Sequence, residues 1–182
     1  MIEPDKVLST FKAKNGVQVI LRTPDMHDLD DLLKLINSLV TERAMITANT
    51  KQSLEAEADY LARIITDNIK GNSIHIVAEA DGHVVGNAEI SRGKGQSAHT
   101  CILGIGLARN YRSIGIGSAL IKELFKHAKK LGLRIVYLEV FASNTHAQNL
   151  YKKMGFKMTG SFPKKIHYGS KHVDSIIMTK EL

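Results

Sequence analysis

Two glycines separated by one residue, Gly115 and Gly117, stand between a run of strand-forming residues, 99–107, and an amphipathic helical pattern, 115–131. Glycines at such a junction let the backbone approach a ligand without interference from a Cβ atom. The free amides and the positive dipole end at the start of a helix suit a phosphate group. Residues 109–118 therefore predict a phosphate cradle, to which Arg112 adds a charged fork. Tight packing of the helix against the strand is the alternative explanation for the glycines.

Two well-known phosphate loops do not fit this segment. A P-loop needs Gly-x-x-x-x-Gly-Lys-Ser/Thr, which the sequence lacks. A dinucleotide-binding loop needs a third glycine where this chain has Leu120, although Glu139 lies near the expected spacing for a ribose-binding acid. The cradle is therefore expected to serve another phosphate-bearing ligand.

The hydrophobic pattern around the cradle alternates between the helical period and the strand period. Asp81-Gly82 is a strong signal for a two-residue hairpin turn, and Gly71 is a typical helix C-cap. Antiparallel strands followed by strand–helix units predict an α/β fold, with a mixed sheet covered by helices on both faces. The expected strands are residues 17–21, 74–79, 83–90, 99–107, 134–141, 156–162 and 173–179, and the expected helices are residues 29–40, 51–68, 115–131 and 145–154.

Length and cysteine content limit the class of protein. The 182 residues fit one domain, residues 1–182. The single cysteine, Cys101, excludes an internal disulfide and a cysteine-based zinc site within one chain, so no metal is expected. The charged N-terminus lacks the apolar core of a signal peptide, and no apolar run approaches the length of a membrane span. We therefore expect a cytoplasmic protein that does not enter the membrane.

The formal charge of +7 indicates an affinity for anions. Nucleic acid is one partner that such a charge attracts. The lysines are scattered, however, and aromatic residues make up only 5% of the chain, so a stacking platform for bases is poorly supplied. Solvated helix faces and a site for a small polyanion explain the charge better than nucleic acid does.

Two segments of the chain resemble the signatures of the GNAT N-acetyltransferase family. Residues 112–117 match its Arg/Gln-x-x-Gly-x-Gly/Ala motif. Residues 138–156 are similar to its second signature, a strand followed by Asn-x-x-Ala-x-x-x-Tyr-x-x-x-Gly-Phe, with Asn144 and Tyr151 at the polar positions. The resemblance covers residues 17–182, in the family's order, and is nearest to the branch of amino-acid, phosphinothricin-type and ribosomal-protein N-acetyltransferases.

The resemblance implies the GNAT fold and a site for acetyl-CoA. The central, mostly antiparallel sheet should splay between its fourth and fifth strands and leave a slot for the pantetheine arm. The implied acetyl-CoA contacts are the strand backbone, the cradle and one amide side chain, namely Ile105, Gly106, Leu107, Arg112, Ser113, Ile114, Gly115, Ile116, Gly117, Ser118 and Asn144. Asn144 or Ser143 also suits a helix N-cap, and the two roles can coexist.

The same resemblance implies Tyr151 as the general acid that protonates the departing sulfur. Many relatives carry a glutamate base on the strand that corresponds to residues 99–107, and this chain has none there. Glu89 on the neighbouring strand is the first alternative, and His99 or a chain of water molecules is the second. Cys101 is not expected to act as a nucleophile, because direct transfer requires no acyl-enzyme.

The expected function is therefore direct transfer of an acetyl group from acetyl-CoA to a primary amine of a small molecule, such as an amino acid or related metabolite. A protein N-terminal acetyltransferase of the ribosomal-protein type is the competing enzyme. An acyl-CoA sensor or a nucleic-acid-binding module is the competing non-enzyme. The partner is thus a small amine or a peptide N-terminus, and the sequence leaves a homodimer open.

Overall fold

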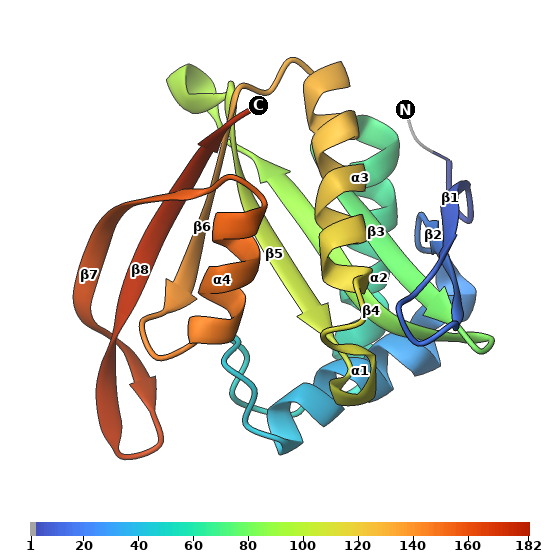
Figure 1. Cartoon of the computed structure of the whole chain (residues 1–182). Helices are drawn as coiled ribbons and strands as arrows, with labels where there is room; N and C mark the ends of the chain where they lie inside the picture. The colour runs from blue at the N-terminus through green and yellow to red at the C-terminus, as the bar shows by residue number, and fades with distance from the viewer. Residues whose placement is uncertain (1–2) are drawn as a thin grey trace.

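The computed structural model describes residues 3–182, which form an eight-stranded sheet in the order β1-β2-β3-β4-β5-β6-β8-β7 (Figure 1). The strands are β1 (Val7–Lys12), β2 (Gln18–Arg22), β3 (Ser73–Ala80), β4 (His83–Arg92), β5 (Thr100–Leu107), β6 (Ile135–Phe141), β7 (Lys157–Tyr168) and β8 (Lys171–Glu181). The α-helices are α1 (Leu29–Thr41), α2 (Leu54–Lys70), α3 (Ile116–Lys130) and α4 (Thr145–Lys153). The predicted mixed sheet with helices is confirmed.

The sheet opens between β5 and β6, which are parallel neighbours, whereas the other neighbouring strands of residues 3–182 are antiparallel. The two strands pair only over Thr100–Ile102 and Ile135–Tyr137. Beyond Ile102, β5 continues beside β4 to Leu107, while β6 continues beside β8 to Phe141. Figure 1 shows the two strands diverging, with α4 in front of the opening. The predicted splay is thus present, and it separates the fifth and sixth strands because residues 7–12 form a strand that was not predicted.

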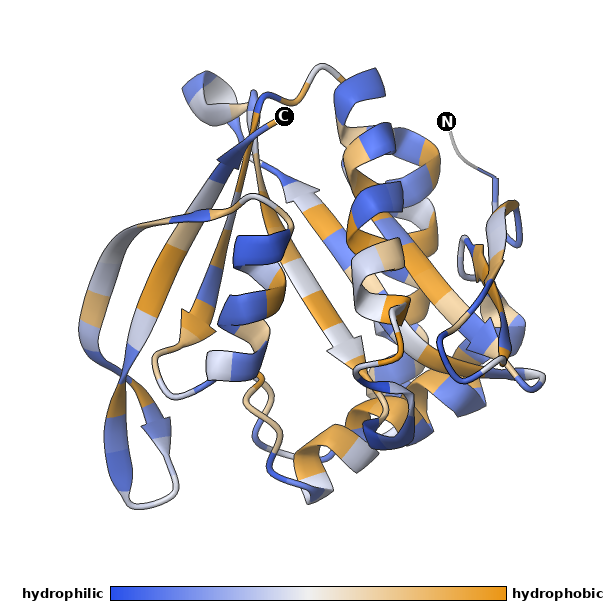
Figure 2. Cartoon of the chain, in the orientation of Figure 1, coloured by the Kyte–Doolittle hydropathy of each residue, from blue (hydrophilic) through white to orange (hydrophobic). Residues whose placement is uncertain are grey.

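The helices cover opposite faces of the sheet. Alternate residues of β3 show the division, because Ile74, Ile76 and Ala78 belong to the core beneath α3 and α4, whereas Val77 packs with α1 and α2. Figure 2 shows apolar residues along the strands and on the helix faces turned toward them. Full burial of each large aliphatic side chain, such as Leu120 or Leu61, stabilises the fold by about 2 kcal/mol.

Local signals in the sequence set several element boundaries. Asp81 and Gly82 both have positive φ, 54° and 77°, as a tight turn between twisted strands requires. The side chain of Ser53 accepts a hydrogen bond from the Ala56 amide at 3.2 Å and caps α2. At the other end of α2, Gly71 has φ 72° and provides the predicted C-cap.

The closing hairpin is longer than predicted. β7 and β8 extend to Tyr168 and Lys171, although residues 163–171 contain Pro163 and three lysines, residue types that are depleted in strands. β7 lies at the edge of the sheet, where proline and exposed lysine are tolerated because one side of the strand needs no partner. The register with β8 shifts between Phe162 and Ile166, next to this proline.

Candidate active site

The predicted phosphate cradle lies at the N-terminus of α3. Ser113 has φ 66° and Gly115 has φ 105°, so the chain turns through two left-handed residues before the helix begins. Within residues 3–182, the backbone N–H groups of residues 113–118 have no hydrogen-bond acceptor, and the first helical bond runs from the Ala119 N–H to the Gly115 carbonyl at 3.1 Å. A row of free amides at the positive end of a helix can bind a phosphate.

Side chains around the cradle connect it to three other elements. The Arg112 guanidinium donates from Nε to the Leu107 carbonyl at 2.9 Å, and its Nη2 forms a short ion pair with Glu42 at the end of α1. Arg112 therefore ties α1 to the end of β5 in this structure, rather than facing the free amides with an unengaged guanidinium. On the other side, Ser113 Oγ lies 3.4 Å from His146 Nε2 on α4, which places a second ionisable group beside the cradle.

The unpaired edge of β5 lies next to the cradle. Residues 103–107 pair with β4 on one side, and beyond Ile102 they have no strand partner on the β6 side. A Cβ atom added to Gly117 would lie 3.3 Å from both Leu107 Cδ1 and Leu150 Cδ2, and 3.6 Å from Ile105 Cδ1. Gly117 therefore allows α3 to pack closely against β5 and α4. An extended chain such as a pantetheine arm can pair with a free strand edge of this kind.

Asn144 caps α4 at the other side of the opening. Its side-chain oxygen accepts a hydrogen bond from the Ala147 N–H at 3.1 Å, so the N-cap role expected for Asn144 or Ser143 belongs to Asn144. Gln148 holds the preceding turn, because its Nε2 donates to the carbonyls of Phe141 and Ala142 at 3.2 and 2.9 Å. The end of β6 is thereby fixed relative to α4. Contact between Asn144 and pantetheine stays a prediction.

Tyr151 is buried in the core beneath α3 and α4, with 8% of its surface exposed. Its ring packs edge-to-face against Phe156 at 5.8 Å between centroids. Burial raises the pKa of the Tyr151 phenol to about 12, so the hydroxyl is protonated at neutral pH. The hydroxyl has no hydrogen-bond partner within residues 3–182, yet its oxygen is not one of the fully buried unpaired atoms. It therefore retains access to solvent or a ligand, as a proton donor requires.

A pocket of about 330 Å³ lies on the opposite face of the sheet, between β4, β5, the two N-terminal helices and residues 46–52. We call it the acceptor pocket. α1 supplies an apolar wall, and polar side chains enter from α2 and β4. The backbone of Gly104–Gly106 forms part of its floor, so the free edge of β5 borders both this pocket and the cradle side. The polar side chains that line it are Thr47, Gln52, Glu57, Tyr60, Asn87 and Glu89.

Glu89, the predicted base, enters the acceptor pocket beside the β5 edge. Its Oε2 lies 3.0 Å from Nδ1 of His75, a residue that is 5% exposed, and the hydrogen bond from His75 lowers the pKa of the Glu89 carboxyl against the opposing effect of burial. Gly104 lies directly opposite Glu89 in the register, and a Cβ there would be 3.1 Å from Glu89 Oε1. Glycine thus leaves room for the carboxylate. Glu89 is ionised at neutral pH and faces a cavity of ligand size.

His75 is itself held in place by α2. β2 pairs with β3 only as far as Val77, so the backbone of His75 has no strand partner on that side. The buried Asn68 side chain replaces it, because Oδ1 accepts from the His75 N–H at 2.7 Å and Nδ2 donates to the His75 carbonyl at 3.0 Å. The position of the His75–Glu89 pair is therefore fixed from both the helix and the sheet.

The other two predicted candidates for proton transfer or nucleophilic attack lie elsewhere. His99 is exposed and precedes β5, five residues and roughly 16 Å of strand away from Gly104. Cys101 is fully buried, its Sγ lies 3.7 Å from the Ile135 carbonyl, and burial raises the pKa of its thiol to about 11. A buried, protonated thiol is a poor nucleophile, which agrees with the expectation for Cys101.

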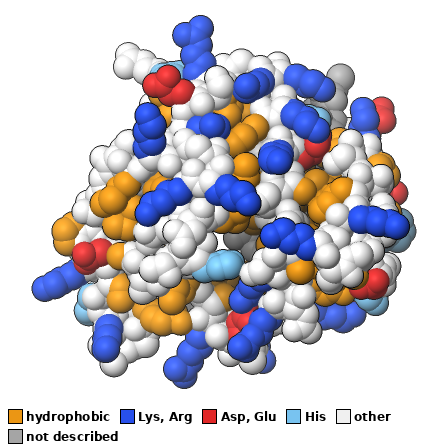
Figure 3. All heavy atoms as spheres, in the orientation of Figure 1, with side chains coloured by type: hydrophobic (Ala, Val, Ile, Leu, Met, Phe, Trp, Pro, Cys, Tyr) orange, Lys and Arg blue, Asp and Glu red, His pale blue; other side chains and the backbone are white. Residues whose placement is uncertain are grey.

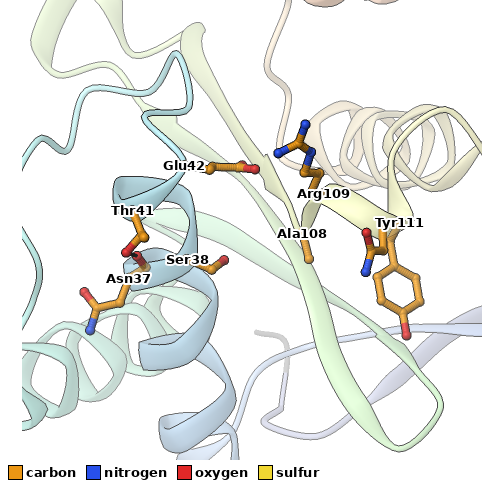
Figure 4. A pocket seen from close by; sticks show the side chains of 8 residues that line it. Asn37, Ser38, Thr41, Glu42, Ala108, Arg109 and Tyr111 are labelled. Atoms are coloured by element: carbon orange, nitrogen blue, oxygen red, sulfur yellow. Dashed lines mark hydrogen bonds between the residues drawn. The ribbon is translucent and has the colours of Figure 1, made fainter. Parts of the chain in front are cut away.

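A second cleft of about 570 Å³ lies between the C-terminal half of α1 and the segment after β5. Figure 4 shows Ser38 of α1 and Glu42, directly after α1, pointing toward Ala108 and Arg109 across it. The lining also includes Asn37, Thr41, Asn110 and Tyr111. Glu42 lines this cleft and also pairs with Arg112. The cleft is therefore next to the cradle, although its lining carries no residue that the sequence had indicated as catalytic.

The surface charge has no single dense patch on the face that Figure 3 shows. Lys and Arg side chains are spread over this face and alternate with apolar ones (Figure 3). The part of the chain that the structure describes has no group of three or more His, Cys, Asp or Glu side chains placed to hold a metal ion. No helix in residues 3–182 combines the length and the apolar character that a membrane span requires.

Sequence reasoning missed four side chains that the fold brings to the site: Glu57, Tyr60, His75 and His146. Glu57 and Tyr60 lie on α2, one turn apart, but nothing in a single sequence pairs that helix with β4. Only the hairpin turn at Asp81-Gly82 gave a signal, because it makes β3 and β4 neighbours and brings His75 near Glu89.

Comparison with known proteins identifies the family to which the region with these features belongs. Residues 38–156 match the family described as "Acetyltransferase (GNAT) family". An N-alpha-acetyltransferase of Sulfurisphaera tokodaii is 30% identical over 158 residues, which cover 80% of this chain and 84% of the relative. Phosphinothricin and L-amino acid N-acetyltransferases are further relatives.

Solved structures agree with the fold. The ribosomal-protein-alanine N-acetyltransferase from Brucella melitensis has a TM-score of 0.80 and 27% identity, with 89% of this chain and 99% of that chain covered. A phosphinothricin acetyltransferase from Sinorhizobium meliloti, solved in complex with AcCoA, has a TM-score of 0.78 and 24% identity, with 90% and 88% covered. The family resemblance inferred from residues 112–117 and 138–156 is confirmed.

Proposed function

The chain belongs to the acetyltransferase (GNAT) family of N-acetyltransferases, and on this basis we propose that it transfers an acetyl group from acetyl-CoA directly to the primary amine of a small molecule. The predicted acceptor, an amino acid or related metabolite, is consistent with relatives that act on L-amino acids. The predicted cytoplasmic location, the single domain and the oligomeric state stay predictions.

The free edge of β5 supports this proposal most. Ile105 and Leu107 direct their side chains toward Gly117 on the cradle side, whereas Gly104 and Gly106 border the acceptor pocket. A donor that pairs with this edge therefore lies between a phosphate-binding helix end and a pocket that holds an ionised carboxylate. Two reactants held on the two sides of one strand meet in a fixed geometry, which is a large part of catalysis.

Acetyl-CoA fits the residues on the donor side. The free amides of residues 113–118 would hold its pyrophosphate, and the edge of Ile105–Leu107 would pair with its pantetheine arm. His146, beside Ser113, would add a donor for phosphate. Acetyl-CoA supplies a thioester that an amine can attack without prior activation, and an amide N–H of β5 near its carbonyl would stabilise the charge that develops on the oxygen.

Two side chains would move the protons. Glu89 attracts the ammonium group of the acceptor and takes, or relays to water, the proton that the amine must lose before it attacks. As the new N–C bond forms and the C–S bond breaks, Tyr151 donates its proton to the departing sulfur. Both groups have the required protonation state at neutral pH, because the Glu89 pKa is lowered and the Tyr151 pKa is raised.

The proposal is tested by incubating the protein with acetyl-CoA and a panel of amines, and by following thiol release together with the mass of the amine. We expect amine-dependent release and an amine heavier by one acetyl group. If acetyl-CoA binds, but neither small amines nor peptides accelerate thiol release, the protein is an acyl-CoA sensor and the proposed function is wrong.

A further inference from the structure

The charges of the acceptor pocket are unbalanced. Its lining includes the carboxylates of Glu57 and Glu89 and, among the residues that the structure describes, no Lys or Arg side chain. Arg63 is near, but its guanidinium stacks over the ring of Tyr60 at 5.2 Å and belongs to an exposed residue. His75 is not among the lining residues, and its Nδ1 is paired with the Glu89 carboxylate. Two negative groups thus face a cavity whose remaining lining is neutral and partly apolar.

Glu57 is the unusual member of this pair. It is 6% exposed, lies in the first turns of α2, and makes no side-chain hydrogen bond or ion pair within residues 3–182. Burial raises the pKa of its carboxyl, and no neighbouring cation offsets that effect. Its oxygens are not fully buried unpaired atoms, so they remain open to the pocket that Glu57 lines. A carboxylate in this situation is stabilised when a cation enters the pocket.

Glu57 and Glu89 reach the acceptor pocket from different elements, α2 and β4. Tyr60 is three residues after Glu57 on α2, about one turn or 5 Å along the helix. Burial raises the pKa of the Tyr60 phenol most, and the charges of Glu89 and Glu57 raise it further, with Glu89 also a hydrogen-bond partner. Tyr60 is therefore near both carboxylates and lines the same pocket. Glu89 is beside Gly104 of β5, where transfer is proposed, whereas Glu57 enters the pocket from α2.

We propose that the acceptor pocket selects a primary amine that carries a second cationic group and no carboxylate, namely an aliphatic diamine or polyamine. The inference rests on the proposed function, because it takes Glu89 to mark the reacting amine, and it replaces the amino acid that the sequence predicted as acceptor with a small amine that lacks a carboxylate. The second ammonium pairs with Glu57, and the methylene chain between the two contacts the apolar wall that Leu35 and Leu39 help to form. The α-carboxylate of a free amino acid, two bonds from its amine, would meet the negative field of both glutamates.

The test compares acceptors that share a five-carbon chain and differ at the far end. The probes are 1,5-diaminopentane, pentylamine and 5-aminopentanoate, and the far group is cationic, neutral and anionic in turn. We expect kcat/KM for thiol release to fall in that order, with about a tenfold step between diamine and pentylamine, carried mainly by KM. Equal values for the diamine and pentylamine, or a faster reaction of 5-aminopentanoate or of L-lysine at its α-amine, would overturn the proposal.

Two variants connect the preference to Glu57. In Glu57→Gln, the ratio of kcat/KM for the diamine to that for pentylamine should fall to near one, and 5-aminopentanoate should become a better acceptor. Glu55→Gln, an exposed neighbour in the same turn, should keep the wild-type ratio. If Glu57→Gln keeps that ratio in a protein with an unchanged melting curve, Glu57 does not bind the second cation and the proposal fails.

The result also separates this inference from the proposed function. Turnover of pentylamine without preference for the diamine refutes the inference and leaves the acetyltransferase intact. If no amine reacts while acetyl-CoA binds, the proposed function itself fails. A peptide amide with N-terminal lysine is the last probe. If it reacts faster than every diamine from three to six carbons, the acceptor is a peptide N-terminus and the diamine proposal is wrong.

Discussion

The donor side and the acceptor side of this molecule offer different kinds of chemical group to a ligand. On the donor side, the groups offered to a ligand are backbone amides of residues 113–118 and the free edge of β5, shaped by Gly115 and Gly117. On the acceptor side, they are side chains, above all Glu57 and Glu89. Backbone groups depend on chain conformation, whereas side chains determine which small molecule fits.

This contrast explains which half of the site a sequence discloses. The donor side is one continuous segment, residues 103–118, together with the start of α4, and its glycines fall at fixed spacings. The acceptor side gathers residues from α1, α2, β3, β4 and β5, which meet only after folding. Local spacing therefore predicts the donor, and tertiary structure determines the acceptor. The predictions below test this division, from the largest expected effect to the smallest.

Tyr151→Phe removes the proton of the proposed general acid and leaves the ring packed against Phe156. We expect kcat to fall by about 100-fold with little change in KM for acetyl-CoA, because general-acid catalysis acts on the transition state. Steady-state kinetics with a reactive amine measures the effect. Tyr137→Phe on β6 is the matched control. A fully active Tyr151→Phe enzyme at every pH would remove Tyr151 from the mechanism.

Gly115→Val should damage the donor side alone. A Cβ at Gly115 meets nothing within 4 Å, so the cost comes from φ 105°, which a β-branched residue adopts only with strain. Strain of about 2 kcal/mol, relieved by moving the amides, corresponds to about a 30-fold weaker Kd for acetyl-CoA. Calorimetry measures it. Gly132→Val, at φ 71° beyond the other end of α3, is equally open and should keep the affinity. Equal loss in both variants would refute a specific role for the cradle.

Glu89→Gln should lower kcat/KM by about 10-fold. The effect is smaller than is usual for loss of a general base, because water that enters the acceptor pocket can take the proton. The sign of the pH dependence follows from the lowered Glu89 pKa. The carboxylate is ionised above that pKa, so activity and the stability of the His75 hydrogen bond are present at neutral pH and are lost as the pH falls through it.

His75→Asn sharpens the same test. Loss of the hydrogen bond that lowers the Glu89 pKa should raise that pKa and move the acid limb of the pH–rate profile to higher pH. Glu55→Gln should leave the limb in place. If the limb persists unchanged in Glu89→Gln, it belongs to another group and Glu89 is not the proton acceptor.

The sequence predicted the mixed sheet, the hairpin turn at Asp81-Gly82 and the C-cap at Gly71, since each depends on local conformation or hydrophobic period. The opening of the sheet was implied by the family resemblance. It missed β1, whose exposed, weakly alternating residues pack against a single strand. It also missed the length of β7, where edge position permits a proline that would interrupt an inner strand.

The register between β3 and β4 shows why side-chain partners were harder to foresee. From the turn pair Ala80–His83, an unbroken register would place His75 opposite Ala88. The register instead shifts by one residue next to the turn, so that His75 lies opposite Glu89. A shift of one residue moves every following side chain to the other face relative to its partner strand. No hydrophobic pattern in this hairpin predicts the register shift.

Arg112 is the donor-side residue whose side chain differs most from its expected place. Its guanidinium is held by Glu42 and the Leu107 carbonyl, which connects the cradle to α1. The guanidinium expected at the phosphate is therefore bound elsewhere in this structure, and the groups that remain free to bind a phosphate are the backbone amides of residues 113–118.

Hydrogen exchange of backbone amides, with and without saturating acetyl-CoA, tests the central claim that backbone groups of the donor side hold the acetyl donor. We predict slower exchange, by about tenfold or more, for residues 113–118 and for the free edge of β5, with little change around Glu57 and Tyr60 on α2. Protection confined to α2 and the acceptor pocket, in a protein that binds acetyl-CoA, would contradict the account.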